Sequence, residues 1–266
     1  MDKNLGSPIA YGRTAEIYPW PNNQVLKLYF DWFSRQSIEY EARIAQVVHH
    51  SGLPVPAVGE IVEVNGRTGL IYERVAGAAL FEVMPKRPWT IFHFARRMAE
   101  LHVEMHSQTI ALEIPRQRQR LVQKIESAAA LPDALRRRVL AALAQLPDGD
   151  QLCHGDFHPA NVLATPQGEV IIDWIDATRG NALADLARSS IIALGVASTP
   201  QTTRTIDKLF MRLFHAIYLR HYFVLRPQGR VEYGRWIPIV AAARLSENIP
   251  ELEQWLLDQV KRGELS

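Results

Sequence analysis

The residue pattern changes near residue 75, and this change restricts the possible folds more than any other feature. Short stretches rich in β-branched and aromatic residues come first, with one helical stripe of apolar residues among them. Apolar residues further along the chain recur mainly at helical spacing. We therefore predict an α+β fold with two lobes: a β-rich lobe at residues 1–75 and a mainly helical lobe at residues 76–266.

Turn residues and apolar spacing place the elements. Asn65-Gly66 separates two apolar stretches and is the dipeptide most typical of a tight β-hairpin. Apolar residues from Ile38 to Val48 predict the helix of the first lobe, which Gly52 and Pro54 would end. The second lobe is expected to have a connector at residues 85–88, short strands at 162–164 and 170–172, and helices near 90–107, 132–145, 184–195, 205–224, 238–248 and 251–260.

Composition excludes several classes of protein. The 266 residues carry 30 Lys and Arg against 28 Asp and Glu, a balance that does not indicate a nucleic-acid or anionic-membrane partner. No apolar stretch approaches the ~20 residues of a membrane span, and no signal peptide is recognisable. The single cysteine, Cys153, cannot form an internal disulfide. We expect a cytoplasmic protein.

Two polar segments carry the chemistry. The first, Cys153-His154-Gly155-Asp156-Phe157-His158-Pro159-Ala160-Asn161, precedes a short apolar strand, and Ile171-Ile172-Asp173-Trp174-Ile175-Asp176 follows it. Phosphoryl transfer needs such a set, because one carboxylate accepts a hydroxyl proton while an amide oxygen and a second carboxylate hold Mg²⁺. The spacing of His154, Asp156 and Asn161 equals that of the H-R-D-x-x-x-x-N kinase catalytic loop, with Gly155 in place of Arg.

A lysine in the first lobe supports this interpretation. Lys27 lies within an apolar strand, where an ammonium group is costly unless it meets a partner. Glu41 on the following helix could be that partner, although its neighbour Glu39 is an alternative; we prefer Glu41 because it adjoins the apolar stripe. Residues 68–75 run from a strand into a connector, where a purine could bind bare backbone groups.

These segments together resemble the aminoglycoside phosphotransferase and choline kinase-like family of small-molecule kinases. The loop from His154 to Leu163 is similar to the catalytic loop of the family, and residues 170–174 are similar to its metal-binding segment. The resemblance covers roughly residues 9–190. It implies a bilobal protein-kinase-like fold, with a small antiparallel sheet and one helix in the first lobe.

The resemblance also implies roles for particular residues. Asp156 would be the catalytic base, and Asn161 and Asp173 would bind Mg²⁺. Lys27 and Glu41 would form the ion pair that orients the phosphates of ATP or GTP. The backbone carbonyl of Glu73 and the backbone amide of Val75 would bind adenine. His154 would brace the catalytic loop, and Asp185 matches an aspartate of the family that is usually structural.

The chain departs from the pattern in one place. The segment expected to cover the phosphates, residues 11–18, has one glycine rather than G-x-G-x-x-G, so fewer backbone amides can approach them. Two histidines in the second lobe, His102 and His106, have the i, i+4 spacing that could bind a metal, although we expect an exposed pair without one. His158 is expected to be a hydrogen-bonding brace, since Mg²⁺ seldom chooses imidazole.

The leading hypothesis is therefore an enzyme that phosphorylates a hydroxyl of a small molecule with ATP or GTP. One alternative is a pseudokinase that binds nucleotide without turnover, although Lys27, Asp156, Asn161 and Asp173 are all present. A less favoured alternative is a metal-dependent hydrolase, whose ligands would be His154, Asp156, His158, Asp173 and Asp176. The first lobe and Lys27 would then have no purpose.

Charge gives one indication about the acceptor. Between residues 186 and 266 there are eleven basic and seven acidic residues. A site for a polycation such as an aminoglycoside should be lined by carboxylates. The basic excess therefore mildly favours a neutral or anionic acceptor, while its identity stays open.

Overall fold

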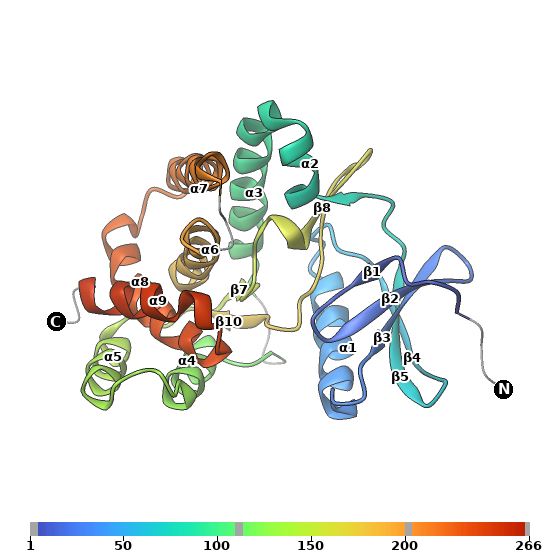
Figure 1. Cartoon of the computed structure of the whole chain (residues 1–266), viewed down its shortest axis with the longest axis horizontal. Coiled ribbons are helices and arrows are strands. Elements are labelled where there is room, and N and C mark those ends of the chain that lie inside the picture. The colour runs from blue at the N-terminus through green and yellow to red at the C-terminus, as the bar shows by residue number, and fades with distance from the viewer. Residues whose placement is uncertain (1–4, 110–113, 200–203, 264–266) are drawn as a thin grey trace. The chain divides into compact units, whose positions relative to one another are not determined.

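A computed structural model describes residues 5–109, 114–199 and 204–263 of the chain. Its backbone divides into two compact units (Figure 1). Unit 1 comprises Met1–Leu80 and Ala160–Ile175, and unit 2 comprises Phe81–Pro159 and Asp176–Ser266. The segment from Ala160 to Ile175, which includes the end of the catalytic-loop sequence, thus clusters with the N-terminal residues.

Unit 1 is built on an antiparallel sheet with the strand order β1-β2-β3-β5-β4. The strands are β1 (Ala10–Tyr11), β2 (Ala15–Trp20), β3 (Gln24–Tyr29), β4 (Val58–Val64) and β5 (Arg67–Glu73). Asn65 and Gly66, both with positive φ, form the tight turn between β4 and β5. The hairpin predicted at this dipeptide is confirmed.

The two faces of this sheet bury different side chains. Successive residues of a strand point to opposite faces, so on β3 Leu26 and Leu28 enter one apolar cluster and Tyr29 enters the other. Helix α1 (Arg35–His49) contributes Ile38 to the cluster of Tyr29. Lys27 shares the parity of Tyr29 and therefore lies on the face that α1 covers.

Two features fix α1 on this face. Ser34 caps the helix, since its hydroxyl accepts a hydrogen bond from the backbone N–H of Ser37 at 3.1 Å. Its buried residues recur at helical spacing, as the apolar stripe predicted, but they include one acid, Glu41. A carboxylate in that position needs a buried partner.

A second sheet in unit 1 carries the metal-binding sequence. It has the order β6-β8-β9, with β6 at Ala78–Ala79, β8 at Val162–Thr165 and β9 at Gly168–Ile171. The backbone N–H of Ile171 donates to the carbonyl of Pro54 at 2.8 Å, which ties β9 to the segment after α1. The two strands expected near residues 162–164 and 170–172 are thus present as a hairpin.

Unit 2 is mainly helical, and α6 runs between α7 and α8 (Figure 1). The longer helices are α3 (Ile91–His106), α4 (Gln117–Ser127), α5 (Asp133–Gln145), α6 (Ala182–Val196), α7 (Thr205–Leu225), α8 (Arg230–Arg244) and α9 (Pro250–Arg262). Trp236 and Ile239 of α8 lie in its apolar core together with Leu143 of α5 and Leu256 of α9. This core holds the helices that present polar side chains to the catalytic loop.

A two-stranded ribbon positions that loop. Strand β7 (Gln151–Cys153) pairs antiparallel with β10 (Thr178–Gly180), and Thr178 lies opposite Cys153. The loop that begins at His154 therefore starts from a paired strand, and α6 begins two residues after β10, capped by the side chain of Asn181.

The helical predictions need three corrections, the first of which is α4, a helix that the expected ranges did not include. Helix α8 begins at Arg230 rather than near residue 238, because Gly229 with φ 84° turns the chain into the helix and Pro238 lies inside it. The connector expected at residues 85–88 contains the end of a short helix, α2 (Leu80–Lys86), with Pro85 in its last turn. Within the part of the chain that the structure describes, no helix is long and apolar enough to span a bilayer.

Candidate active site

A buried ion pair occupies the helix-covered face of the unit 1 sheet. The Nζ of Lys27 on β3 lies 2.7 Å from Oε1 of Glu41 on α1, and Glu41 is only 2% exposed. The hydroxyl of Tyr72 on β5 donates to the same carboxylate oxygen at 3.0 Å. Three elements that are far apart in the sequence thus fix the position of one ammonium group.

The alternative partner of Lys27 is used elsewhere. The carboxylate of Glu39 lies 3.0 Å from Nε of Arg35 on the same helix, and both side chains are more than half exposed. Residues 39 and 41 are two positions apart on a helix and so point in different directions. The structure thus pairs Glu41, and not Glu39, with Lys27.

Lys27 has a second carboxylate neighbour. Its Nζ lies 3.2 Å from Oδ1 of Asp173, whose side chain is 43% exposed. Burial lowers the pKa of Lys27, but the charges of Asp173 and Glu41 outweigh it and leave the pKa above its usual range. The ammonium group therefore keeps its proton at neutral pH.

Asn161 and Asp173 lie at the same end of the β8–β9 hairpin. Asn161 directly precedes β8, and Asp173 follows β9 after one further residue. The backbone N–H of Ile172 donates to the carbonyl of Asn161 at 3.0 Å, so the pairing continues beyond the strands. Asp173 has a φ of 64°, a left-handed conformation that is uncommon for a residue with a side chain and that functional sites often maintain.

The donor chemistry at this end of the hairpin fits a hard cation. Mg²⁺ prefers carboxylate and amide oxygens, and Asp173 and Asn161 offer one of each. The half-exposed carboxylate of Asp173 is accessible to a ligand, whereas the buried one of Glu41 is not.

The two residues expected near adenine lie where β5 ends. Glu73 is the last residue of that strand, and its backbone N–H donates to Ala57 at 2.8 Å. Val75 lies two residues beyond, and its carbonyl accepts from the N–H of Gly77 at 3.0 Å.

In unit 2, Asp156 is held by two donors. Nε2 of His158 lies 3.3 Å from its Oδ2, and Nη2 of Arg188 on α6 lies 3.4 Å from its Oδ1. Burial alone would raise the pKa of Asp156, but the hydrogen bond from His158 and the charge of Arg188 outweigh it, so the pKa lies well below its usual range. His158 thus braces the carboxylate, as its place in the sequence suggested.

Arg188 also fixes the backbone of the loop. Its Nε donates to the carbonyl of Gly155 at 3.0 Å. Gly155 has a φ of 80°, and a side chain there would collide with the backbone oxygen of Asp176. Sequence reasoning missed Arg188, although it and Asp185 are the only charged residues of α6, which is otherwise mostly apolar.

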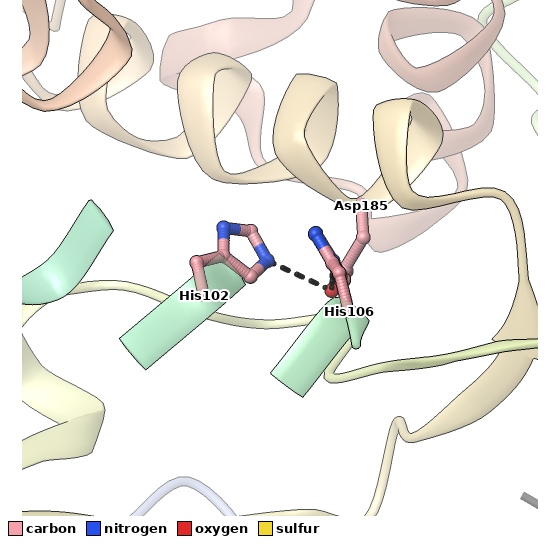
Figure 2. Close-up of side chains that lie close together, drawn as sticks. All are labelled: His102, His106 and Asp185. Carbon is pink, nitrogen blue, oxygen red and sulfur yellow. Dashed lines mark hydrogen bonds and ion pairs between the residues drawn. The ribbon is translucent and has the colours of Figure 1, made fainter. Parts of the chain in front are cut away.

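A buried carboxylate anchors the start of the catalytic loop. Asp185 is 1% exposed, and its two oxygens accept the backbone N–H groups of His154 at 2.7 Å and Gly155 at 2.8 Å. Figure 2 shows that His102 and His106 of α3 point toward the same carboxylate, at 3.0 and 3.3 Å. The imidazole of His154 accepts the N–H of Asp156 at 3.2 Å, which tightens the turn.

The prediction of an exposed His102 and His106 pair is therefore wrong. Both side chains are buried, because the face of α3 that carries them packs against α7 and contacts Asp185 of α6. Their Nδ1 atoms lie 2.5 Å from the hydroxyl of Tyr218 and 2.8 Å from that of Tyr222. Periodicity alone could not reveal these partners, which are more than a hundred residues away.

The geometry of this cluster would permit a metal ion, but its hydrogen bonds are complete without one. The candidate ligand atoms of His102, His106 and Asp185 lie within 4.8 Å of one another. Each Nε2 lies within hydrogen-bond distance of Asp185, and each Nδ1 within hydrogen-bond distance of a tyrosine hydroxyl. Burial and the neighbouring His102 lower the pKa of His106 to about 3, which keeps its ring neutral.

Solved structures with the same fold include an aminoglycoside phosphotransferase and two small-molecule kinases. A thermostable mutant of aminoglycoside phosphotransferase APH(4)-Ia, in complex with AMP-PNP and hygromycin B, aligns with a TM-score of 0.64 and 16% identity over 96% of this chain and 91% of its own. The amicoumacin kinase hAmiN, in complex with AMP-PNP, Ca²⁺ and Ami, aligns with a TM-score of 0.63 and 14% identity over 96% and 86%. Choline kinase from Cryptosporidium parvum Iowa II aligns with a TM-score of 0.55 and 14% identity over 96% and 86%.

These alignments confirm the α+β protein-kinase-like fold. No curated protein matches the sequence. The sequence model of the Phosphotransferase enzyme family, however, matches residues 22–226, which is most of the chain and includes both polar segments. The chain belongs to the phosphotransferase enzyme family.

Proposed function

We propose that this protein transfers the γ-phosphoryl group of ATP or GTP to a hydroxyl group of a small molecule. The observation that carries the proposal is the protonated Lys27 between the carboxylates of Glu41 and Asp173. An ammonium fixed in this way is suited to phosphate oxygens. ATP is favoured because two proteins of the same fold were solved with AMP-PNP.

The nucleotide half of the reaction uses unit 1. Lys27 binds the α- and β-phosphates, and Glu41 holds the ammonium group in place. The backbone carbonyl of Glu73 and the backbone amide of Val75 bind the adenine edge. These two contacts use no side chain, so they do not distinguish ATP from GTP by residue type.

Asn161 and Asp173 are the residues proposed to hold Mg²⁺. When bound, Mg²⁺ offsets the negative charge on the β- and γ-phosphate oxygens. The left-handed backbone of Asp173 keeps its carboxylate at the open end of the β8–β9 hairpin. The ion pair with Lys27 orients that carboxylate before the nucleotide arrives.

Asp156 is the proposed base. The acceptor oxygen forms a bond to the γ-phosphorus while the bond from this phosphorus to the β,γ-bridging oxygen breaks, which releases ADP or GDP. The hydroxyl proton passes to the carboxylate of Asp156. Its low pKa keeps the carboxylate ionised, so it can accept a hydrogen bond from the hydroxyl, and His158 and Arg188 fix its direction.

ADP and GDP release tests the proposal. Purified protein with Mg²⁺ and ATP or GTP is screened against sugars, amino alcohols, hydroxy acids and antibiotics. We expect Asp156→Asn to lower kcat by about a thousandfold and to leave nucleotide affinity within a factor of about three. The matched control is Asp133→Asn, at an exposed residue on α5, which should behave as the parent.

Two results would count against the proposal. Turnover by Asp156→Asn at the parental rate would remove Asp156 as the base. Tight nucleotide binding without release of ADP or GDP for any acceptor would instead indicate a nucleotide-binding module without turnover.

A further inference from the structure

Unit 2 contains a small cavity beside the catalytic loop. Its volume is about 50 Å³, and it is lined by Arg120 and Lys124 of α4, Gly155, Asp176, Arg188 of α6 and Arg244 of α8. Gly155 precedes Asp156, and Arg188 contacts Asp156 directly. The cavity therefore adjoins the carboxylate proposed as the base.

The acids of this cavity already have partners. Oδ1 of Asp176 lies 3.1 Å from Nη1 of Arg120 and 3.6 Å from Nζ of Lys124. Asp185, which also lines the cavity, accepts hydrogen bonds from two backbone N–H groups and contacts the imidazoles of His102 and His106. A cationic ligand would meet four basic side chains and no carboxylate without a partner.

Two nitrogens of one of these basic groups lack hydrogen-bond acceptors. Arg244 is 9% exposed, and its Nε and Nη1 are buried without a hydrogen-bond partner. Its nearest acid, Glu247, lies 3.7 Å from Nε and only 2.6 Å from Nη2 of Arg188, so Arg188 takes the closer contact. Burial and the charge of Arg188 lower the pKa of Arg244 to about 10. A buried guanidinium in this state would be stabilised by an anion.

We propose that this cavity binds the anionic group, a carboxylate or a phosphate, of an acceptor whose hydroxyl is phosphorylated at Asp156. The inference rests on the proposed function. A volume that holds a few water molecules also holds one such oxyanion, whereas the rest of the acceptor would lie outside it. Arg244 and Lys124 would bind the oxyanion. Arg188, which lines the cavity and contacts Asp156, would hold the bound acceptor next to the proposed base.

Anion binding is measured first, without turnover. Calorimetry follows the binding of inorganic phosphate and of glycerate to the full chain and to single variants. We expect Lys124→Gln to weaken binding about tenfold and Arg244→Gln to weaken it further, because each removes a charge-assisted contact. Arg137→Gln, which removes an exposed charge on α5, should change nothing. Lys124 is partly exposed, so its variant remains informative if Arg244→Gln does not fold.

Lys27→Met separates this cavity from the nucleotide site. Anion binding that survives in Lys27→Met but weakens in Lys124→Gln supports the proposal. Two results overturn it: neither anion binds the parent, or binding is lost in Lys27→Met and kept in Lys124→Gln.

Turnover then tests the acceptor class with pairs that differ in one group. Glucose 6-phosphate is compared with glucose, glycerate with glycerol, and glucosamine serves as the cationic member. We expect kcat/KM to favour the anionic members by about tenfold or more, and Lys124→Gln to reduce that preference. The gain in kcat/KM from glucose to glucose 6-phosphate is then compared with the gain from glycerol to glycerate. The larger gain shows whether the cavity prefers a phosphate or a carboxylate.

The remaining outcomes separate the two proposals. ADP release with a neutral or cationic acceptor preferred would overturn the anionic acceptor and leave the proposed function intact. Anion binding at the cavity by a chain that binds no nucleotide would overturn the proposed function, and with it the role of the cavity in acceptor binding.

Discussion

Two buried polar clusters, one from each unit, differ in how accessible their carboxylates are. The Lys27 cluster of unit 1 consists of Lys27, Glu41, Tyr72 and Asp173. The Asp185 cluster of unit 2 consists of His102, His106, Asp185, Tyr218 and Tyr222.

The two aspartates show the difference. Asp173 is 43% exposed and has a strained backbone, whereas Asp185 is 1% exposed and accepts hydrogen bonds from two backbone amides and two imidazoles. Buried polar groups must be satisfied within the protein, while a half-exposed carboxylate beside a charged lysine can exchange partners. Polar density alone therefore does not identify a ligand site; accessible, incompletely used groups do.

The largest effect on stability is expected from Asp185→Ala. It would leave two backbone N–H groups and two imidazoles without their shared acceptor, and we expect a loss of about 3–5 kcal/mol in the free energy of unfolding. Urea denaturation measures this loss. The control Asp133→Ala, at an exposed site, should stay within about 0.5 kcal/mol. A loss no larger than that of the control would show that the cluster is not an anchor.

Glu41→Gln tests the Lys27 cluster. The change keeps the shape of the side chain but removes the buried negative charge beside the ammonium group of Lys27. We therefore expect nucleotide affinity to fall about tenfold and the free energy of unfolding to fall by about 1–3 kcal/mol. Calorimetry and urea denaturation measure the two effects. Glu39→Gln on the same helix is the matched control and should match the parent in both. Equal effects of the two variants would contradict the pairing of Lys27 with Glu41.

The Asp185 cluster should make stability depend on pH. His106 has a pKa of about 3 in the folded chain, lowered by burial from an ordinary 6.5. Between these values the unfolded chain binds a proton that the folded chain does not, so stability falls as the pH falls through this window, by about 1.4 kcal/mol per pH unit for this one group.

The contribution of His106 is isolated by subtraction. His106→Gln should flatten the pH dependence of the free energy of unfolding below pH 6.5 relative to the parent, whereas His50→Gln, at an exposed site, should not change it. Parallel curves for parent and His106→Gln would show that this ring is not neutral in the folded chain.

The smallest expected effect is that of Tyr72→Phe. It removes one hydrogen bond to Glu41 and keeps the ring, so we expect a loss of about 0.5–1.5 kcal/mol in stability and a decrease of a few-fold in nucleotide affinity. Tyr233→Phe on α8, which removes a hydrogen bond to Ser190 and none to Glu41, is the control. Identical nucleotide affinity in both variants would show that the hydroxyl of Tyr72 does not help to position Glu41.

Local patterns in the sequence were sufficient for much of the fold. The hairpin at Asn65-Gly66 and the stripe from Ile38 to Val48 depend on residues close in the chain, and both elements are present. The start of α8 differs from the prediction because Pro238 resembles a first helical residue, whereas the helix begins at Arg230, directly after Gly229, and includes the buried Trp236.

Long-range partners could not be predicted in the same way. His102 and His106 have the spacing of an exposed pair, and only packing against residues more than a hundred positions away buries them. Arg188 and Arg244 were missed as neighbours of the catalytic loop for the same reason. The sequence could nevertheless have pointed to Arg188, because a lone arginine in a largely apolar helix needs a buried acceptor.

The decisive measurement is a calorimetric titration of AMP-PNP into the full chain with and without Mg²⁺. If Asp173 and Asn161 hold the metal beside Lys27, Mg²⁺ should strengthen AMP-PNP binding by about tenfold or more, and Asp173→Asn should abolish that gain while Asp31→Asn, in an exposed turn, keeps it. An equal gain in Asp173→Asn, or no gain in the parent, would contradict the account.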